Sequence, residues 1–136
     1  MTANLDQFYQ TVGAQAYIPT TELSQRWTTA VLQTLGFHLP RRTKRALVKA
    51  LPPDLGQAVT DIFWLLHFRD PSLTAKEFQK QVAKRSGHTD AVYARFPILA
   101  VLGAIKQQID PQLSAQIARD LSPEVRALWE EAGSEQ

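Results

Sequence analysis

A recurrence of apolar residues at a fixed spacing of 70 positions, as from Phe8 to Phe78, constrains the fold of this chain most. The two stretches align without a gap, and identical residues coincide with apolar pairs between them. Further identities are Val12 with Val82, residues 30–32 with 100–102, Leu51 with Leu121, and Pro53 with Pro123. A gapless recurrence of this kind predicts an internal duplication, with residues 1–66 as the first copy and 71–136 as the second.

Within each copy, the apolar residues follow the period of a helix and not that of a strand. Residues such as Leu23, Trp27 and Leu35 recur at helical spacing, and no hairpin dipeptide or sustained period-two alternation occurs. Candidate helix starts are Asn4, Thr20 or Thr21, Pro40, Pro53, Thr74 with Glu77, Asp110 with Pro111, and Ser122 with Pro123. The sequence therefore predicts an all-α fold: two tandem four-helix repeats packed into one helical bundle, which forms one compact domain.

Two places break the symmetry between the copies. Pro97 lies where the first copy has Trp27, so we expect the second helix of copy two to start near Pro97 or to kink there. The segment DIFWLLHF, residues 61–68, is apolar on nearly all sides of a helix. We therefore expect residues 53–68 to form a central helix between the halves, with an exposed oligomer interface as the alternative.

Three motifs recur in both copies: a Phe-x3-Val first helix, an Ala-Val-Leu second helix, and a closing Leu-Pro-Pro or Leu-Ser-Pro element followed by an acid. The first copy has them at Phe8 and Val12, at 30–35 and at 51–55, and the second copy has them in EFQKQVAKRSG (77–87), AVLGAI (100–105) and LSPEVRALW (121–129). With these motifs the chain resembles the uncharacterised bacterial family catalogued as domain of unknown function 2267. The resemblance implies an all-helical tandem fold, and it implies no activity.

The sequence offers no recognisable catalytic or metal-binding motif. It contains no cysteine, and its three histidines have no partner at metal-chelating spacing. No nucleophile elbow or glycine-rich phosphate loop occurs. We therefore expect no enzyme activity, no cofactor and no metal. A small enzyme or ligand-binding bundle stays possible if a cavity lies between the halves, where Trp27, Trp64 and Trp129 are candidate lining residues.

The location of the protein is predicted from the same composition. No apolar run approaches the roughly 18 residues that a membrane helix needs, and the N-terminus predicts no secretory signal. The lack of cysteine fits a reducing compartment. These features predict a cytoplasmic protein without a membrane span, while the oligomeric state is left open.

One short segment, HLPRRTKRALVK at residues 38–49, concentrates positive charge. On a helical wheel its cations gather on one side, opposite an apolar side of Leu47, Val48, Ala50 and Leu51, and Lys44 lies at the boundary. This basic face consists of Arg41, Arg42, Arg45 and Lys49. The second copy has Pro111, Gln112, Ala115 and Arg119 at the equivalent places, so it lacks three of the four charges, and the fold does not require a basic face there.

The basic face has three interpretations. It can be an ordinary solvated surface, a docking site for an acidic protein surface, or a contact with nucleic acid or an anionic membrane. Nucleic acid is disfavoured because no aromatic residues alternate with the cations, and because the chain has an acidic tail. The sequence thus predicts a non-catalytic interaction or adaptor module that binds an acidic protein surface, with nucleic-acid or anionic-surface binding as the alternative.

Overall fold

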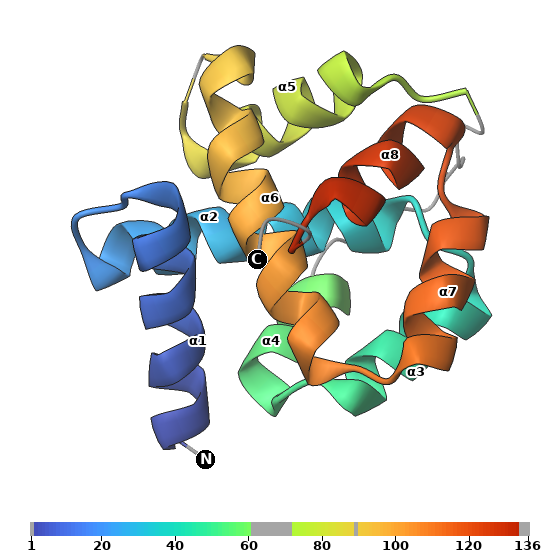
Figure 1. Ribbon diagram of the computed structural model, residues 1–136, viewed down its shortest axis with the longest axis horizontal. Coiled ribbons are helices and arrows are strands. Elements are labelled where there is room, and N and C mark those ends of the chain that lie inside the picture. Colours follow the sequence, from blue (N-terminus) through green and yellow to red (C-terminus); the bar gives the residue numbers. More distant parts are fainter. Residues whose placement is uncertain (1, 61–71, 89, 134–136) are drawn as a thin grey trace.

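The computed structural model describes residues 2–60, 72–88 and 90–133, and within them every regular element is an α-helix (Figure 1). The first four helices are α1 (Thr2–Ala16), α2 (Thr21–Phe37), α3 (Arg41–Ala50) and α4 (Pro53–Thr60). The other four are α5 (Ala75–Ser86), α6 (Ala91–Gln108), α7 (Pro111–Asp120) and α8 (Pro123–Glu131). The described part of the chain is therefore the all-α helical bundle that the sequence predicts.

The helices recur in the same order and at the spacing that the sequence shows. The pair α3 and α7 begins at Arg41 and Pro111, which are 70 residues apart, and both helices are 10 residues long. The starts of α2 and α6, and those of α4 and α8, differ by the same spacing. The helix boundaries thus follow the 70-residue register, while the origin of the two halves by duplication stays a prediction.

Two helices, α2 and α6, occupy the centre of the bundle and contact one another (Figure 1). Helix α1 packs on both of them, and so does α5. Each first helix therefore rests on the second helix of the other half as well as on its own. At the far end, α3 and α7 contact each other, so the halves meet there too.

One hydrophobic cluster joins side chains from both halves of the chain. It includes Trp27 and Leu32 from the first half and Phe78, Ile98 and Trp129 from the second, each at most 2 % exposed. Burial of a large apolar side chain contributes about 1.5–3 kcal/mol, so these residues dominate the stability of the bundle. Of the predicted central helix 53–68, residues 53–60 form α4, and the remainder lies outside the described residues.

Most of the predicted helix starts are confirmed. The side chains of Thr20, Thr74, Asp110 and Ser122 each accept a hydrogen bond from the backbone N–H three residues ahead. Such a bond satisfies one of the free donors in the first turn of a helix, which is why these short polar side chains mark helix starts.

Two predicted starts are wrong, while the alternative of a kink at Pro97 stays a prediction. Helix α1 begins at Thr2, so Asn4 lies inside it and is not its cap. Helix α6 begins at Ala91, six residues before Pro97, and Asp90 caps it by accepting from the Tyr93 N–H. A proline within a helix removes one backbone hydrogen bond. Here the cap at Asp90 and the burial of the α6 side chains outweigh that loss.

Candidate functional site

Helix α3 lies at the end of the bundle, between α4 and α7 (Figure 1). Its inner side is anchored by Leu47, which is fully buried, and by the hydroxyl of Thr43, which donates a hydrogen bond to the Asp120 carboxylate of α7. These contacts fix the rotation of α3 about its own axis. They therefore determine which of its side chains face outward.

The outward side of α3 carries the basic face. All four cations of that face are exposed, as the helical wheel predicts, whereas Ala50, placed by the wheel on the apolar side, is exposed as well. Within the described residues, no hydrogen bond or ion pair engages Arg41, Arg42, Arg45 or Lys49. Three of these cations, Arg41, Arg45 and Lys49, are spaced four residues apart. They form a row about 12 Å long, because a helix rises about 1.5 Å per residue.

The start of α3 is electrostatically unfavourable for the helix itself. Its cap position is held by Pro40, which provides no side-chain hydrogen bond, and its first turn contains no acidic residue. Arg41 and Arg42 instead place positive charge at the positive pole of the helix dipole. The equivalent helix α7 has the opposite arrangement, with an Asp110 cap and Pro111 at its first position.

Lys44 shows the electrostatic effect of this arrangement. Its side chain is half-buried at the edge of the basic face. Burial, together with the positive charge of Arg41, lowers the pKa of Lys44 below its ordinary value. The face is therefore a concentration of like charges, and an anionic partner would reduce the repulsion between them.

A second row of cations lies on α5 and was missed in the sequence interpretation. Lys76, Lys80 and Lys84 are exposed and are spaced four residues apart, as are Arg41, Arg45 and Lys49 on α3. The signal was available, because lysines at intervals of four share one side of a helix. Unlike α3, this helix has a capped start at Thr74 and carries Glu77 in its first turn.

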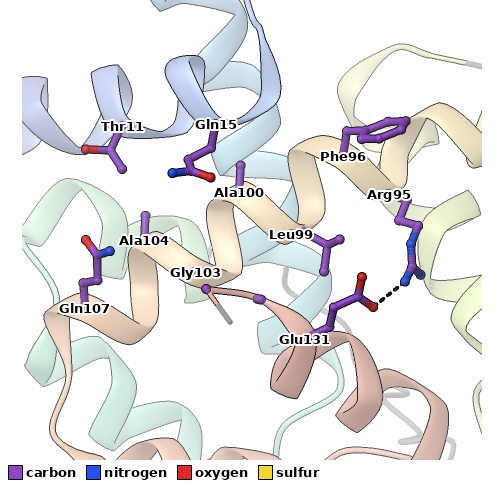
Figure 2. Close-up of a pocket in the computed structure, with 12 residues that line it drawn as sticks. Thr11, Gln15, Arg95, Phe96, Leu99, Ala100, Gly103, Ala104, Gln107 and Glu131 are labelled. Carbon is purple, nitrogen blue, oxygen red and sulfur yellow. Dashed lines mark hydrogen bonds and ion pairs between the residues drawn. The ribbon is translucent and has the colours of Figure 1, made fainter. Parts of the chain in front are cut away.

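A groove between α1 and α6 is the other feature that sequence reasoning did not find (Figure 2). It consists of two adjoining pockets of about 210 and 200 Å³, which share Thr11, Ala104 and Gln107. One end is bounded by the Arg95–Glu131 ion pair between α6 and α8. Its position follows from packing of α1 on the other half, which no local pattern reveals.

Neither of the two described tryptophans lines this groove. Trp27 and Trp129 are buried in the core at 2 % and 1 % exposure, and Trp64 lies outside the described residues. His38 is at the C-terminal end of α2, where its Nε2 shares a hydrogen bond with Gln81 Oε1 at 2.9 Å. In the described ranges, no three metal-ligating side chains come together, and no helix has the length and apolarity to span a membrane.

The fold and its surface define a class of protein, an all-α bundle of eight described helices that presents a basic helix face at one end. Residues 5–131 match the family described as "Uncharacterized conserved protein (DUF2267)". Because that match covers nearly the whole chain, the protein belongs to this family. No curated protein matches the chain.

Proposed function

We propose that the protein is a non-catalytic interaction or adaptor module, and that the basic face of α3 binds an acidic surface on another protein. The observation that carries this proposal is the conflict between these cations and their own helix. Arg41 and Arg42 occupy the positive pole of α3, where they oppose its formation, and no described residue pairs with them. Residues that break a local stability rule without an internal gain are candidates for function.

An acidic protein surface fits the face better than phosphate does. Arginine binds carboxylates in a bidentate manner, and three of the four residues are arginines. The row from Arg41 through Arg45 to Lys49 has the spacing of one side of a helix, so it matches acidic residues at intervals of four on a partner helix. Helix α3 itself contains no aromatic side chain for base stacking.

The test uses two fluorescent peptides of one composition. The first forms a helix with glutamates at intervals of four, and the second has the same residues in scrambled order. We expect the protein to bind the first peptide more tightly by fluorescence anisotropy, with an affinity that falls as salt rises. The triple change Arg41→Glu, Arg45→Glu and Lys49→Glu should weaken binding about tenfold or more.

The chain provides a matched control for this variant. The triple change Lys76→Glu, Lys80→Glu and Lys84→Glu alters three exposed cations at the same spacing on α5. It changes the net charge by the same amount and should leave peptide binding nearly unaltered. Equal losses in both variants would show general attraction by net charge, and the proposal would then be wrong.

Binding of a DNA duplex of random sequence distinguishes the alternative, nucleic-acid function from binding of an acidic protein. If α3 contacted phosphates, duplex binding would exceed peptide binding at equal salt. The logarithm of its affinity would also fall by about 0.9 per phosphate contact for each tenfold rise in salt. Tight, α3-dependent duplex binding would replace the acidic-protein proposal with the nucleic-acid function.

A further inference from the structure

Two helix pairs correspond in the 70-residue register, and both pairs pack together: α2 with α5, and α6 with α1. Between α2 and α5, polar and aromatic side chains fill the seam. Arg85 Nη1 donates a hydrogen bond to Thr34 Oγ1 at 2.7 Å, and its guanidinium lies 5.8 Å from the centre of the Phe37 ring. The guanidinium is therefore a planar group held between a hydroxyl and a ring.

The same seam continues toward the end of α2. The His38 ring shares a hydrogen bond with Gln81 and lies 6.3 Å from the Phe78 ring. Six side chains thus interlock along the seam between α2 and α5, and none of them lines either of the two pockets that form the groove.

The pair α1 and α6 has different side chains at five of those six positions and keeps the phenylalanine at the sixth. Moving 70 residues along the chain gives Gln15 for Arg85, Ala104 for Thr34, Gln107 for Phe37, Thr11 for Gln81, Gln108 for His38 and Phe8 for Phe78. All six of these residues line the two adjoining pockets of the groove. The groove is therefore the counterpart of a filled seam, in which the guanidinium and the facing ring have been replaced by smaller groups.

The remaining groups of the groove define what can enter it. Gln15 extends from α1 toward α6 (Figure 2). Gln107 lies at the end of the groove that is remote from the Arg95–Glu131 ion pair. Each carboxamide offers both donors and an acceptor. Along the base of the groove, the small side chains of Ala100 and Ala104 leave room for a flat group beside α6, while Gly103 lies against the backbone of Gly133.

The charges in the groove neutralise each other. Arg95 and Glu131 form an ion pair with each other, and the other polar lining residues are amides and a threonine hydroxyl. A charged ligand would lose hydration here and meet no unpaired opposite charge. At its rim, Phe96 is 60 % exposed and provides an apolar ring beside the entrance.

We propose that the α1–α6 groove binds a small uncharged ligand that combines a flat ring with an amide-type hydrogen-bonding edge. The ligand would occupy the place that the Arg85 guanidinium and the Phe37 ring fill in the other seam. The larger pocket holds about 210 Å³. This volume suits a ligand of roughly seven to ten non-hydrogen atoms, if each takes about 20–30 Å³, by comparison with a water molecule in the liquid. This site is separate from α3, so it does not depend on the proposed function.

Three probes of one shape test the proposal: benzamide, benzoate and benzamidine, which are neutral, anionic and cationic. Each is titrated to millimolar concentration into the isotopically labelled protein, and backbone amide shifts are followed by NMR. We expect saturable shifts for benzamide at Thr11, Gly103, Ala104 and Gln107. Benzoate and benzamidine should shift these resonances less at equal concentration. Equal or stronger binding of a charged probe overturns the proposal, as does the absence of benzamide shifts at the groove.

Two variants locate the binding. The double change Gln15→Ala and Gln107→Ala alters two exposed side chains, so the fold should persist while benzamide binding weakens severalfold. Gln112→Ala on α7, also at an exposed position, is the matched control and should bind benzamide as the original chain does. Undiminished binding in the double variant contradicts the proposal.

A third variant copies the filled seam into the groove. The changes Gln15→Arg, Ala104→Thr and Gln107→Phe install the groups that lie at 85, 34 and 37. We expect this variant to melt at a temperature no lower than the original chain and to lose the benzamide shifts. A folded variant that still binds benzamide at these resonances overturns the assignment of the site.

Discussion

At the scale of single residues, two threonines of α2 are equally buried but differ in whether their hydroxyl groups form hydrogen bonds. Thr28 and Thr34 are both fully buried. The Thr34 hydroxyl donates to the Ala30 carbonyl at 2.8 Å and accepts from Arg85. The Thr28 hydroxyl has no hydrogen-bond partner in the described residues, and 70 residues further on the chain has the apolar Ile98, also buried. Only one of these hydroxyls therefore contributes to stability.

We expect Thr28→Val and Thr34→Val to change the free energy of unfolding in different directions. Valine keeps the shape of threonine, so Thr28→Val removes an unsatisfied polar group and should leave stability equal or raise it by up to about 1 kcal/mol. Thr34→Val leaves the half-buried Arg85 without its partner and should cost about 1.5–3 kcal/mol. Urea unfolding followed by circular dichroism measures both. A loss at Thr28 as large as that at Thr34 would contradict this assignment.

Tyr9 gives the protein a dependence on alkaline pH. Its side chain is buried against Phe8, and burial raises the pKa of its phenol above the ordinary value of 10.0, with Asp54 and Asp6 adding to the effect. Because the folded pKa exceeds the unfolded one, the folded chain holds this proton more tightly. The stability that Tyr9 contributes is complete below pH 10 and is lost as pH rises through the folded pKa.

The change Tyr9→Phe should remove that dependence. We expect the free energy of unfolding of the variant to fall less steeply above pH 10 than that of the original chain, while the two curves run parallel near pH 7. Urea unfolding over a series of pH values measures the difference between the curves. Parallel curves throughout the alkaline range would contradict the role of the phenol.

At the scale of elements, sequence reasoning succeeds where a signal is local. Caps such as Asp110 and Ser122 were recognisable because one side chain satisfies its own helix start. The predicted start near Pro97 is wrong because the cap at Asp90 begins the helix earlier, and the buried side chains of α6 lie on both sides of the proline. The exposure of the basic face followed from the periodicity of α3. The α1–α6 groove could not be predicted, because it depends on which helix of the other half α1 contacts.

Charge changes at the two ends of α3 should have opposite effects on stability. Arg41→Glu replaces a cation at the positive pole of the helix dipole by an anion, which should raise the free energy of unfolding by roughly 0.3–1 kcal/mol at low salt. Lys49 lies in the last turn, where a cation is favourable, so Lys49→Glu should lower stability by a similar amount. Thermal unfolding at low and at high salt checks both signs, since salt should weaken each effect.

Two outcomes of this pair of changes would be informative for the proposed function. If Arg41→Glu stabilises the chain and also weakens binding to the acidic peptide, stability and binding oppose each other at α3, as they do at many functional sites. If Arg41→Glu destabilises the chain, Arg41 stabilises its own helix. The conflict between Arg41 and α3, on which the proposed function rests, is then absent.

At the scale of the whole molecule, the contacts between helices nearly repeat when the two halves are exchanged. The contact of α1 with α6 corresponds to that of α5 with α2, and the contact of α2 with α4 corresponds to that of α6 with α8. The contacts of α2 with α6 and of α3 with α7 each join equivalent helices, so exchanging the halves leaves them unchanged. Two similar units related by an approximate two-fold axis would give such a pattern, as in a dimer with identical contacts on both sides, and the tandem-repeat arrangement stays a prediction.

This arrangement predicts that neither half folds by itself as a monomer. In residues 1–70 alone, α1 and α2 would lose the surfaces of α6 and α5 on which they pack, and the core would lose Phe78, Ile98 and Trp129. A unit of this size is marginally stable even when its core is complete, because it buries only about 60 % of its surface.

We expect residues 1–70 and 71–136, expressed separately, to have reduced helicity at low concentration and to regain it when mixed in equal amounts. Circular dichroism and sedimentation would detect a one-to-one complex, or a symmetric dimer of one half, since the contacts permit both. A half that stays monomeric and melts cooperatively would show that its helices make a sufficient core of their own, and the contacts between the halves would then be secondary to the fold.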